Sequence, residues 1–407
     1  MAGGGERSRP TAFGGGVPGV PGNRGPNIRG AVNHRQPEVY SLGDGLAARV
    51  RYAVARRAVT DNPPGKAPPM LRTPRPLLLL ATGLFLACGA PTDDEGSIRV
   101  ALLTSGPVSD AGWYAGAYEG LQRIEQELGA TVSHQQTATP AEFDEAFLAY
   151  ASAGYDLVFA HGNEYQDAAI RAGEQFPELT IVVSGGGRIA ENVAPLIFRL
   201  EEGSYLAGMA AAAMTRSGII GMVGGVAIPP ARGTFRAFEA GARSVRPDVE
   251  VLEVFTGDWN DVAAAKEAAV AQLSRGADVL IHNLDAASFA VFQAVREARA
   301  EGRTVWALGM NSNQNDVAPD VILGSAVIRI ADAFVETARM WQNGEVGGAA
   351  IYASTRQEVI DFVFNPAALD EVPPELVERV AEARVLIREG SLDVPRVPFI
   401  EGEAGVQ

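Results

Sequence analysis

The chain has 407 residues, enough for two or three domains of about 150 residues each. Hydrophobic residues make up 47% of the chain and charged residues 20%, a balance that excludes wholesale disorder. The net charge of −15 argues against a nucleic-acid partner, and the single cysteine excludes an internal disulfide framework and any cysteine-cluster metal site.

Residues 1–69 form a basic leading segment that is rich in glycine, proline and arginine. The chain up to Cys88 carries a net charge of +8, which leaves −23 for residues 89–407. A composition of this kind, without hydrophobic periodicity, cannot bury a core. We therefore expect residues 1–69 to be disordered.

Residues 70–88 have the layout of a bacterial lipoprotein signal peptide. Met70 opens a short basic segment, the apolar run 77–87 follows, and Cys88 comes next. Eleven apolar residues span about 16 Å as a helix, too short for a bilayer core of about 30 Å. We expect Cys88 to be lipidated; a buried helix and a cleaved, unlipidated secreted protein are the alternatives. Since a signal peptide works at the start of a chain, we also expect translation to begin at Met70, which makes residues 1–69 a spurious upstream segment.

After an acidic tether at 89–97, short apolar runs alternate with amphipathic stretches. Alternation of such strands with helices of 10–16 residues indicates βαβ units on parallel sheets. The expected strands are 98–103, 131–135, 157–160, 180–184, 196–198, 219–223, 250–254, 279–283 and 305–309. The expected helices lie near 113–128, 141–153, 166–175, 203–216, 234–245, 262–274, 286–300 and 330–342.

About nine strands are more than one compact open sheet needs, so we expect an α/β fold with two doubly wound, Rossmann-like lobes. Ligands of such lobes bind outside the carboxyl ends of the strands, and two facing lobes form a cleft. The apolar run 321–328 and the helix at 330–342 come after the second half, and we expect both to return to the first lobe.

The loops that follow the expected strands carry an ordered set of motifs. They are SDAGWYAGAYEG at 109–120, AHGNEYQDA at 160–168, EGSYLAG at 202–208, GMVGG at 221–225, AFEAGAR at 237–243, GDWND at 257–261 and GADV at 276–279. This set resembles the BMP (basic membrane lipoprotein) family over about residues 98–400. Members of that family are substrate-binding lipoproteins of ABC importers, and several bind purine nucleosides.

The resemblance implies a type I periplasmic-binding-protein fold with three hinge crossings. Lobe one would be formed by about 98–198 plus 318–346, and lobe two by about 199–317 plus 347–400. It further implies an extracytoplasmic monomer, anchored to the membrane through Cys88, that presents a small ligand to an ABC permease and its ATPase.

Lobe one offers candidate ligand contacts in the loops after its first and third strands. Asp110 can accept a hydrogen bond from a ligand and Trp113 can stack on a flat one, with helix capping and core packing as the alternatives. Asp167 resembles the family aspartate that contacts the ligand's base, and Asn163 lies in the same loop. A solvent-facing acid at a helix start is the alternative for Asp167, and His161 is equally well explained as a structural histidine.

Lobe two offers an aromatic and acidic set. Phe238 matches the family position whose ring stacks on the base, with Phe235 as the neighbouring candidate, although an aromatic on an amphipathic helix is usually part of the core. Trp259 resembles a cleft-lining position, as does Asp261, which is equally suited to cap the following helix. Asp285 follows the eighth strand and is a further candidate cleft acid.

Residues 309–314 (GMNSNQ) depart from the Gly-x-Asp-Ser-Asp-Gln pattern that is common in the family. Asn311 and Asn313 stand where members have carboxylates that take ribose hydroxyls, and neutral amides bind a diol without charge-assisted bonds. Ile328 stands where the family often has a lysine, and Arg329 follows it, pointing in another direction along a strand. Both departures weaken the expectation of a nucleoside, but not that of a binding protein.

We therefore expect a binding protein without cofactor or metal that holds a small ligand in an interlobe cleft, with a purine nucleoside favoured. A ligand sensor that docks on a signalling partner is one alternative, and an α/β enzyme with a nucleotide cofactor is another. The sequence contains no dinucleotide fingerprint, no Walker lysine and no Gly-x-Ser-x-Gly elbow, which counts against the enzyme.

Overall fold

The structure, a computed structural model, describes residues 97–110 and 112–400. The predictions for residues 1–69, for the signal peptide at 70–88 with Cys88, and for most of the tether at 89–97 lie outside the described residues. In the part described, helices alternate with strands, and the strands form two six-stranded sheets.

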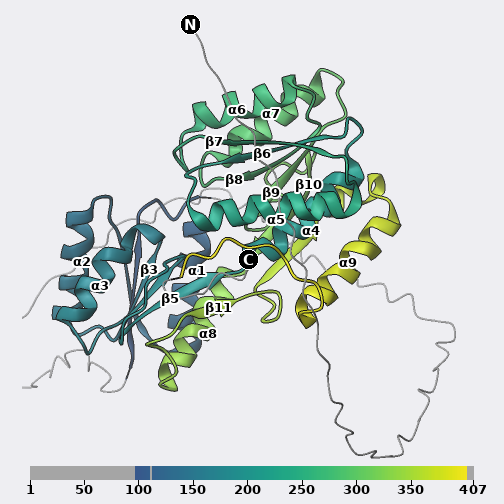
Figure 1. The fold of residues 1–407 in the computed structure, drawn as a ribbon. Helices are drawn as coiled ribbons and strands as arrows, with labels where there is room; N and C mark the ends of the chain where they lie inside the picture. The colour runs from purple at the N-terminus through teal and green to yellow at the C-terminus, as the bar shows by residue number, and fades with distance from the viewer. Residues whose placement is uncertain (1–96, 111, 401–407) are drawn as a thin grey trace, which may run out of the picture. The chain divides into compact units, whose positions relative to one another are not determined.

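The first sheet consists of parallel strands in the order β11-β5-β4-β3-β1-β2, and we call it with its helices lobe one (Figure 1). Its strands are β1 (Arg99–Thr104), β2 (Thr131–Gln136), β3 (Leu157–His161), β4 (Thr180–Ser184), β5 (Val193–Phe198) and β11 (Ile351–Ala353). Its helices are α1 (Trp113–Leu128), α2 (Pro140–Ser152), α3 (Gln166–Gln175) and α8 (Ile330–Gln342), and a 3-10 turn, η1 (Asn163–Tyr165), precedes α3.

The second sheet has the order β12-β10-β9-β8-β6-β7, in which only β12 runs antiparallel to its neighbour, and we call it with its helices lobe two. Its strands are β6 (Ile219–Gly224), β7 (Glu250–Phe255), β8 (Val279–Asn283), β9 (Trp306–Asn311), β10 (Ile322–Ile328) and β12 (Ile360–Phe364). Helices α6 (Val262–Ser274) and α7 (Ser288–Ala300) cover one face of this sheet, and α4 (Leu200–Met214) and α5 (Pro229–Val245) cover the other (Figure 1). A 3-10 helix, η2 (Pro366–Glu371), and α9 (Pro374–Glu389) follow β12.

Burial explains why these segments form parallel strands. Every residue of β3, β8, β9 and β10 is buried. A strand that is covered by helices on both faces needs a continuous apolar run instead of an alternating one. The predicted α/β fold with two Rossmann-like lobes is therefore confirmed.

The strand pairing corrects the expected lobe boundaries in two places. β10 pairs with β9 and β12, so residues 322–328 belong to lobe two and do not return to lobe one as expected. β11 pairs with β5, so residues 351–353 belong to lobe one. Seven consecutive buried residues in β10 require a neighbour on each side, and the second sheet supplies both. Helix α8 does belong to lobe one, where Phe334 stacks on Phe159 of β3 with ring centroids 4.3 Å apart.

The chain passes between the lobes at three places, and backbone hydrogen bonds join these crossings. The crossings are β5 to α4, β10 to α8 and β11 to β12. The Arg199 N–H in the first donates to the Ala353 carbonyl in the third at 2.8 Å, and the Arg329 N–H in the second donates to the Val359 carbonyl, also at 2.8 Å. The Thr355 N–H donates to the Glu202 carboxylate of α4 at 2.7 Å. The three crossings thus form one bonded unit.

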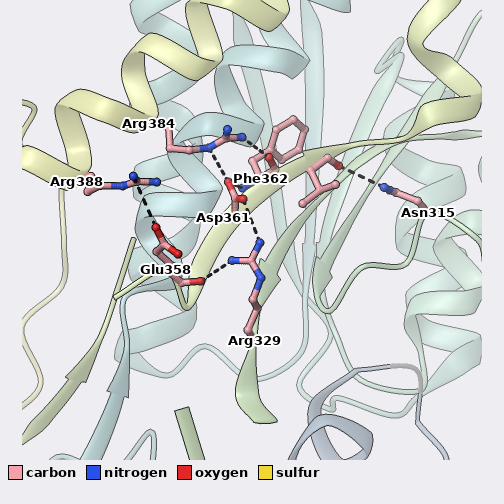
Figure 2. Close-up of polar contacts among 8 residues, drawn as sticks. Asn315, Arg329, Glu358, Asp361, Phe362, Arg384 and Arg388 are labelled. Atoms are coloured by element: carbon pink, nitrogen blue, oxygen red, sulfur yellow. Dashed lines mark hydrogen bonds and ion pairs between the residues drawn. The ribbon is translucent and has the colours of Figure 1, made fainter. Parts of the chain in front are cut away.

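Side chains extend this unit to α9, as Figure 2 shows. Asp361 at the start of β12 accepts from Arg329 at 3.3 Å and lies 2.6 Å from Nε of Arg384 on α9. Arg384 also donates to the Phe362 carbonyl at 2.7 Å, and Arg388 lies 3.8 Å from the Glu358 carboxylate. Asp361 is therefore the carboxylate that pairs with both the second crossing and the C-terminal helix.

No helix among the described residues is both long and apolar enough to cross a membrane.

Candidate functional site

A cavity of about 430 Å³ lies between the two lobes, at the carboxyl ends of the strands. Lobe one contributes the ends of β1, β3 and β4, and lobe two contributes the ends of β6, β8 and β9 together with the start of α5. Such a volume suits a small organic ligand, and the carboxyl ends of parallel strands are where α/β folds bind one.

Trp113 forms an aromatic wall of the cavity from lobe one. It stacks on His161 with ring centroids 4.0 Å apart, and it meets Phe198 edge to face at 5.7 Å. His161 Nε2 lies 3.0 Å from the Trp113 carbonyl oxygen, to which it donates. Burial lowers the pKa of His161 to about 3, so its ring is neutral. His161 is therefore a structural histidine that positions Trp113 and does not itself line the cavity.

Glu164 brings a carboxylate into the cavity, where Ser105 holds it and in turn bonds to Tyr114. The Ser105 hydroxyl bonds to the Glu164 carboxylate and lies 2.8 Å from the Tyr114 hydroxyl. Crowding by protein atoms raises the pKa of Glu164 above its ordinary value. Burial raises the pKa of Tyr114, and the charges of Asp285 and Glu164 raise it further.

Trp259 and Asp285 face the cavity from lobe two. Trp259 packs against the backbone of Gly225, where a Cβ would lie 2.3 Å from its ring, so a glycine is required at that position. The Asp285 N–H donates to the Trp259 carbonyl at 3.1 Å, which ties the two residues together. Burial raises the pKa of Asp285 to about 8, and the nearby charges of Asp110, Glu164 and Asp258 act in the same direction.

Amide side chains complete the wall of lobe two. Asn283 donates to the Thr234 hydroxyl at 3.0 Å, and Thr234 in turn donates to the Ala231 carbonyl at 2.8 Å. Asn311 at the end of β9 has a φ of 71°, in the left-handed region that asparagine tolerates better than most residues. A strained residue of this kind at the end of a strand is typical of binding sites.

A third acid, Glu201, lies at the start of α4 and lines the cavity beside the first crossing. Burial raises its pKa to about 7, although the charges of Arg199 and Arg396 partly oppose this. Among the described residues that line the cavity, none is an arginine, a lysine or a histidine. The cavity therefore disfavours anionic ligands and accommodates neutral or cationic ones.

Ser184 supplies an unused hydroxyl. Its Oγ is fully buried, lies at the cavity wall and has no hydrogen-bond partner in the part of the chain that the structure describes. A buried polar atom without a partner is costly, and a ligand that bonds to it removes that cost.

The cavity brings together five of the nine predicted ligand contacts and adds others that the sequence did not indicate. The five are Trp113, Asn163, Trp259, Asp285 and Asn311. The added residues include Ser105, Glu164, Ser184, Glu201, Asn260, Asn283 and Phe399. Most of these lie within one residue of a strand end or next to a predicted contact, so a systematic search of strand ends could have found them.

Two of the predicted acids are engaged elsewhere. The Asp110 carboxylate accepts from the backbone N–H groups of Tyr114 at 2.9 Å and Ala115 at 2.7 Å, which is the helix-capping alternative. Asp167 keeps 74% of its side chain exposed and pairs with Arg188 at 3.0 Å, so it is the solvent-facing acid at a helix start. Neither of them lines the cavity.

Phe238 does not line the cavity from lobe two. It is fully buried in the core, on the face of α5 that packs against α4. The two helix backbones approach so closely that a Cβ on Gly208 would lie 2.0 Å from the Phe238 carbonyl oxygen. The neighbouring candidate, Phe235, is also fully buried and packs on Phe255 at 5.0 Å.

Of the remaining candidates from the sequence, one lines the cavity and the others lie elsewhere. Asn313 lines a groove beside Asp110 instead of the cavity, and its side chain accepts from the Asn315 N–H at 3.2 Å. Asp261 caps α6 by accepting from the Ala264 N–H at 2.9 Å. Ile328 lines the cavity, whereas Arg329 takes part in the network around Asp361.

Comparison with known proteins agrees with this geometry. The family model described as ABC transporter substrate-binding protein, PnrA-like (Bmp), matches residues 97–391. The chain belongs to the Bmp family. The Bmp family consists of substrate-binding proteins of ABC transporters, which work outside the cytoplasm with the transporter components, and not of enzymes.

Individual relatives are distant but cover most of both chains. A protein named purine-binding protein, from Brucella abortus, is 25% identical over 78% of this chain and 88% of its own length. One named transcriptional activator protein med, from Bacillus subtilis, is 26% identical over 75% of this chain and 92% of its own length.

The solved structures show the same fold as this Bmp chain. A solute-binding protein of an ABC transporter system from Aeropyrum pernix is 21% identical, covers 73% of this chain and 92% of its own, and superposes with a TM-score of 0.65. The fold is therefore that of the type I periplasmic binding proteins. Among the described residues, no group of three or more His, Cys, Asp or Glu side chains is placed to hold a metal ion.

Proposed function

We propose that this Bmp protein is the receptor of an ABC importer for a flat, non-anionic ligand, and that the ligand is a purine nucleoside. The observation that carries the proposal is the pair Trp113 and Trp259, which line one cavity from opposite lobes where no cationic side chain is present among the described residues. A relative of this chain is named for purine binding, which supports the same ligand class.

The cavity offers complementary groups for each part of a nucleoside. The tryptophans suit the faces of the base, and each ring stacked in a dry cleft contributes about 0.5–1.5 kcal/mol beyond its buried area. Asp285, Glu164 and the amides of Asn283 and Asn311 can bond ring nitrogens and ribose hydroxyls. Nucleotides are disfavoured, because their phosphates would meet carboxylates without a compensating cation.

The ligand is tested by thermal unfolding of the purified full-length chain with adenosine, guanosine, inosine, adenine, glucose and AMP. We expect the nucleosides to raise the melting temperature and AMP to have no effect. If all three nucleosides fail while a free base or a sugar succeeds, the nucleoside assignment is wrong.

Anchoring through Cys88 forms a second part of the proposal. A lipid-modified Cys88 would hold the receptor at the outer face of the membrane, since a diacyl group anchors a protein stably. The substitution Cys88→Ser should release the protein from membranes washed in high salt. A mass spectrum of the uncleaved native precursor tests whether any part of residues 1–69 is translated.

A sensor that docks on a signalling partner is the second candidate function. It is favoured by one observation, the relative from Bacillus subtilis named as a transcriptional activator. Ligand-dependent stimulation of ATPase activity in a reconstituted permease and ATPase complex distinguishes the two. The importer requires that stimulation, and the sensor does not.

A further inference from the structure

The segment after α9 lies outside the part of the chain that matches the Bmp family model. That match ends at residue 391, whereas the described chain continues to Ile400. Helix α9 ends at Gly390 in a left-handed turn, and the N–H groups of Ser391 and Leu392 both donate to the Leu386 carbonyl. This capped end sets the direction in which the chain leaves lobe two.

From there the segment runs across the interlobe crossings (Figure 1, yellow). Leu392 packs against the main core and Val394 is buried. Asp393 and Arg396 share a pocket of about 230 Å³ with residues of the first crossing, Arg199 and Glu201. The segment is therefore fixed over the crossings at several points.

The segment ends against lobe one. Gly187, in the loop after β4, packs so closely on Phe399 that a Cβ on the glycine would lie 2.3 Å from the Phe399 carbonyl oxygen. Ile400 is buried, and Phe399 lines the ligand cavity. The chain has thus left lobe two, passed the crossings and reached the cavity wall of lobe one.

We propose that residues 391–400 form a strap, a fourth and non-covalent connection between the lobes, and that Phe399 is a ligand-binding residue of the cleft. The role of Phe399 in binding rests on the proposed function of the cavity, whereas the strap does not. Any motion that separates the lobes must detach or slide the contact between Gly187 and Phe399. The strap therefore limits opening of the cleft and slows the release of a ligand.

Binding is tested by titrating full-length variants with adenosine and adenine while following tryptophan fluorescence, because Trp113 and Trp259 line the cavity. Whichever of the two probes wild type binds, we expect Phe399→Ala to bind it about tenfold more weakly. The variant lacks the phenyl ring and therefore buries less apolar area against the ligand. Phe289→Ala is the matched control, because it removes an exposed phenylalanine of α7. Equal affinity of Phe399→Ala and wild type would contradict the role of Phe399.

The strap is tested without any ligand, by spin-label distances between lobes. Labels at Glu145→Cys on α2 and Glu267→Cys on α6 in a Cys88→Ser background report the interlobe separation. We expect truncation after Leu392, which keeps the capped end of α9, to broaden the distance distribution. We expect Gly187→Ala to do the same, because its new methyl group displaces Phe399 while the strap stays in the chain.

The two tests separate the two proposals. If the distance distribution is unchanged in both variants, and thermal unfolding shows that both are folded, the proposal of a strap is wrong. This holds even if adenosine binds. If no nucleoside or base binds wild type while both variants broaden the distance distribution, the ligand proposal and the role of Phe399 are wrong. The strap proposal is then still supported.

Discussion

Three carboxyl groups that line the cleft have raised pKa values. Shielding from water by the surrounding protein atoms is the largest cause for Asp285, Glu164 and Glu201 alike. A neutral carboxyl group can donate a hydrogen bond as well as accept one. The protonation of these groups therefore decides which ligand atoms the cleft can bond.

Asp285 makes stability depend on pH. Its carboxyl is ionised above its ordinary pKa of 3.8 when the chain is unfolded, but only above about pH 8 when folded. Between these values the folded protein holds a proton that the unfolded chain has released, so its contribution to the free energy of unfolding falls as pH rises. We expect Asp285→Asn to lose less stability than wild type between pH 5 and pH 8 in urea unfolding.

Asp320→Asn is the control for this measurement. Arg296 lowers the pKa of Asp320, so that group stays ionised in both states across the same window. Glu164 and Glu201 remain in every variant, so part of the decrease of the free energy of unfolding with pH remains as well. Identical pH profiles for wild type and Asp285→Asn would contradict the assignment.

Trp259 is expected to supply stacking energy from lobe two. Replacing it in Trp259→Leu should weaken adenosine binding about threefold to tenfold, which corresponds to the contribution of an aromatic pair. Trp341→Leu is the matched control, because Trp341 lies on α8 and donates to the Thr180 hydroxyl, away from the cavity. Isothermal titration at one temperature measures both, and equal losses would show that the effect is not local.

The sequence could indicate some residues of the site and not others, depending on their positions relative to the strand ends. Asp285 comes two residues after β8, where the rule for carboxyl ends of parallel strands applies, whereas Trp113 and Trp259 were indicated by the family resemblance of the loops that hold them. Phe238 is buried in the core and does not line the cavity. The sequence could not show this, because a helical aromatic that packs against a neighbouring helix has the same local pattern as one that faces a cleft. Phe399 had no local signal at all, since only the path of the chain after α9 brings it to the cavity.

At the scale of elements, the contact between α4 and α5 fixes the wall of lobe two. A Cβ on Gly241 would lie 1.9 Å from the Tyr205 carbonyl oxygen, and one on Gly208 would lie 2.0 Å from that of Phe238. The helix backbones therefore touch, and the start of α5 at Ala231 and Thr234 is held at the cavity.

Gly241→Ala is expected to force these helices apart. The loss should be about 1–3 kcal/mol in the free energy of unfolding, because the methyl group meets backbone that cannot rotate away. Arg236→Ala, on the exposed face of α5, is the control and should change stability by less than about 0.5 kcal/mol. Denaturant unfolding measures both, and a neutral Gly241→Ala would show that α4 and α5 can separate freely.

The elements that the sequence missed are those whose partners lie far along the chain. β11 has three residues and gains its place only by pairing with β5, more than 150 residues earlier. The apolar run of β10 was noted only as a segment expected to return to lobe one, but its lobe depends on pairing with β9 and β12, and sequence inspection did not find β12. Periodicity identifies an element, whereas long-range pairing decides the sheet to which it belongs.

At the scale of the whole described part, the crossings determine how the lobes can move. Backbone hydrogen bonds join Arg199 to Ala353 and Arg329 to Val359. Bending of the backbone at one crossing therefore displaces the others. Asp361 adds a charged connection from Arg329 to α9 (Figure 2). Opening of the cleft is therefore expected to be a motion of all crossings together, as in hinge closure of other two-lobed binding proteins.

Asp361→Ala tests the strength of this connection. The Asp361 side chain is only 18% exposed, and its removal leaves Arg329 and Arg384 without their shared ion-pair partner. We expect the free energy of unfolding to fall by about 1–2 kcal/mol, since a partly buried arginine that loses its acceptor is poorly solvated. Asp320→Ala removes the partner of Arg296 from a pair that is about half exposed on both sides, and should lower stability by less than about 1 kcal/mol. Because salt screens the exposed pair more than the shielded one, the difference between the two variants should persist at high ionic strength. If both variants lose the same free energy of unfolding, and salt reduces both losses, the ion pairs of Asp361 are ordinary surface ion pairs. The crossings would then be joined by their backbone hydrogen bonds alone.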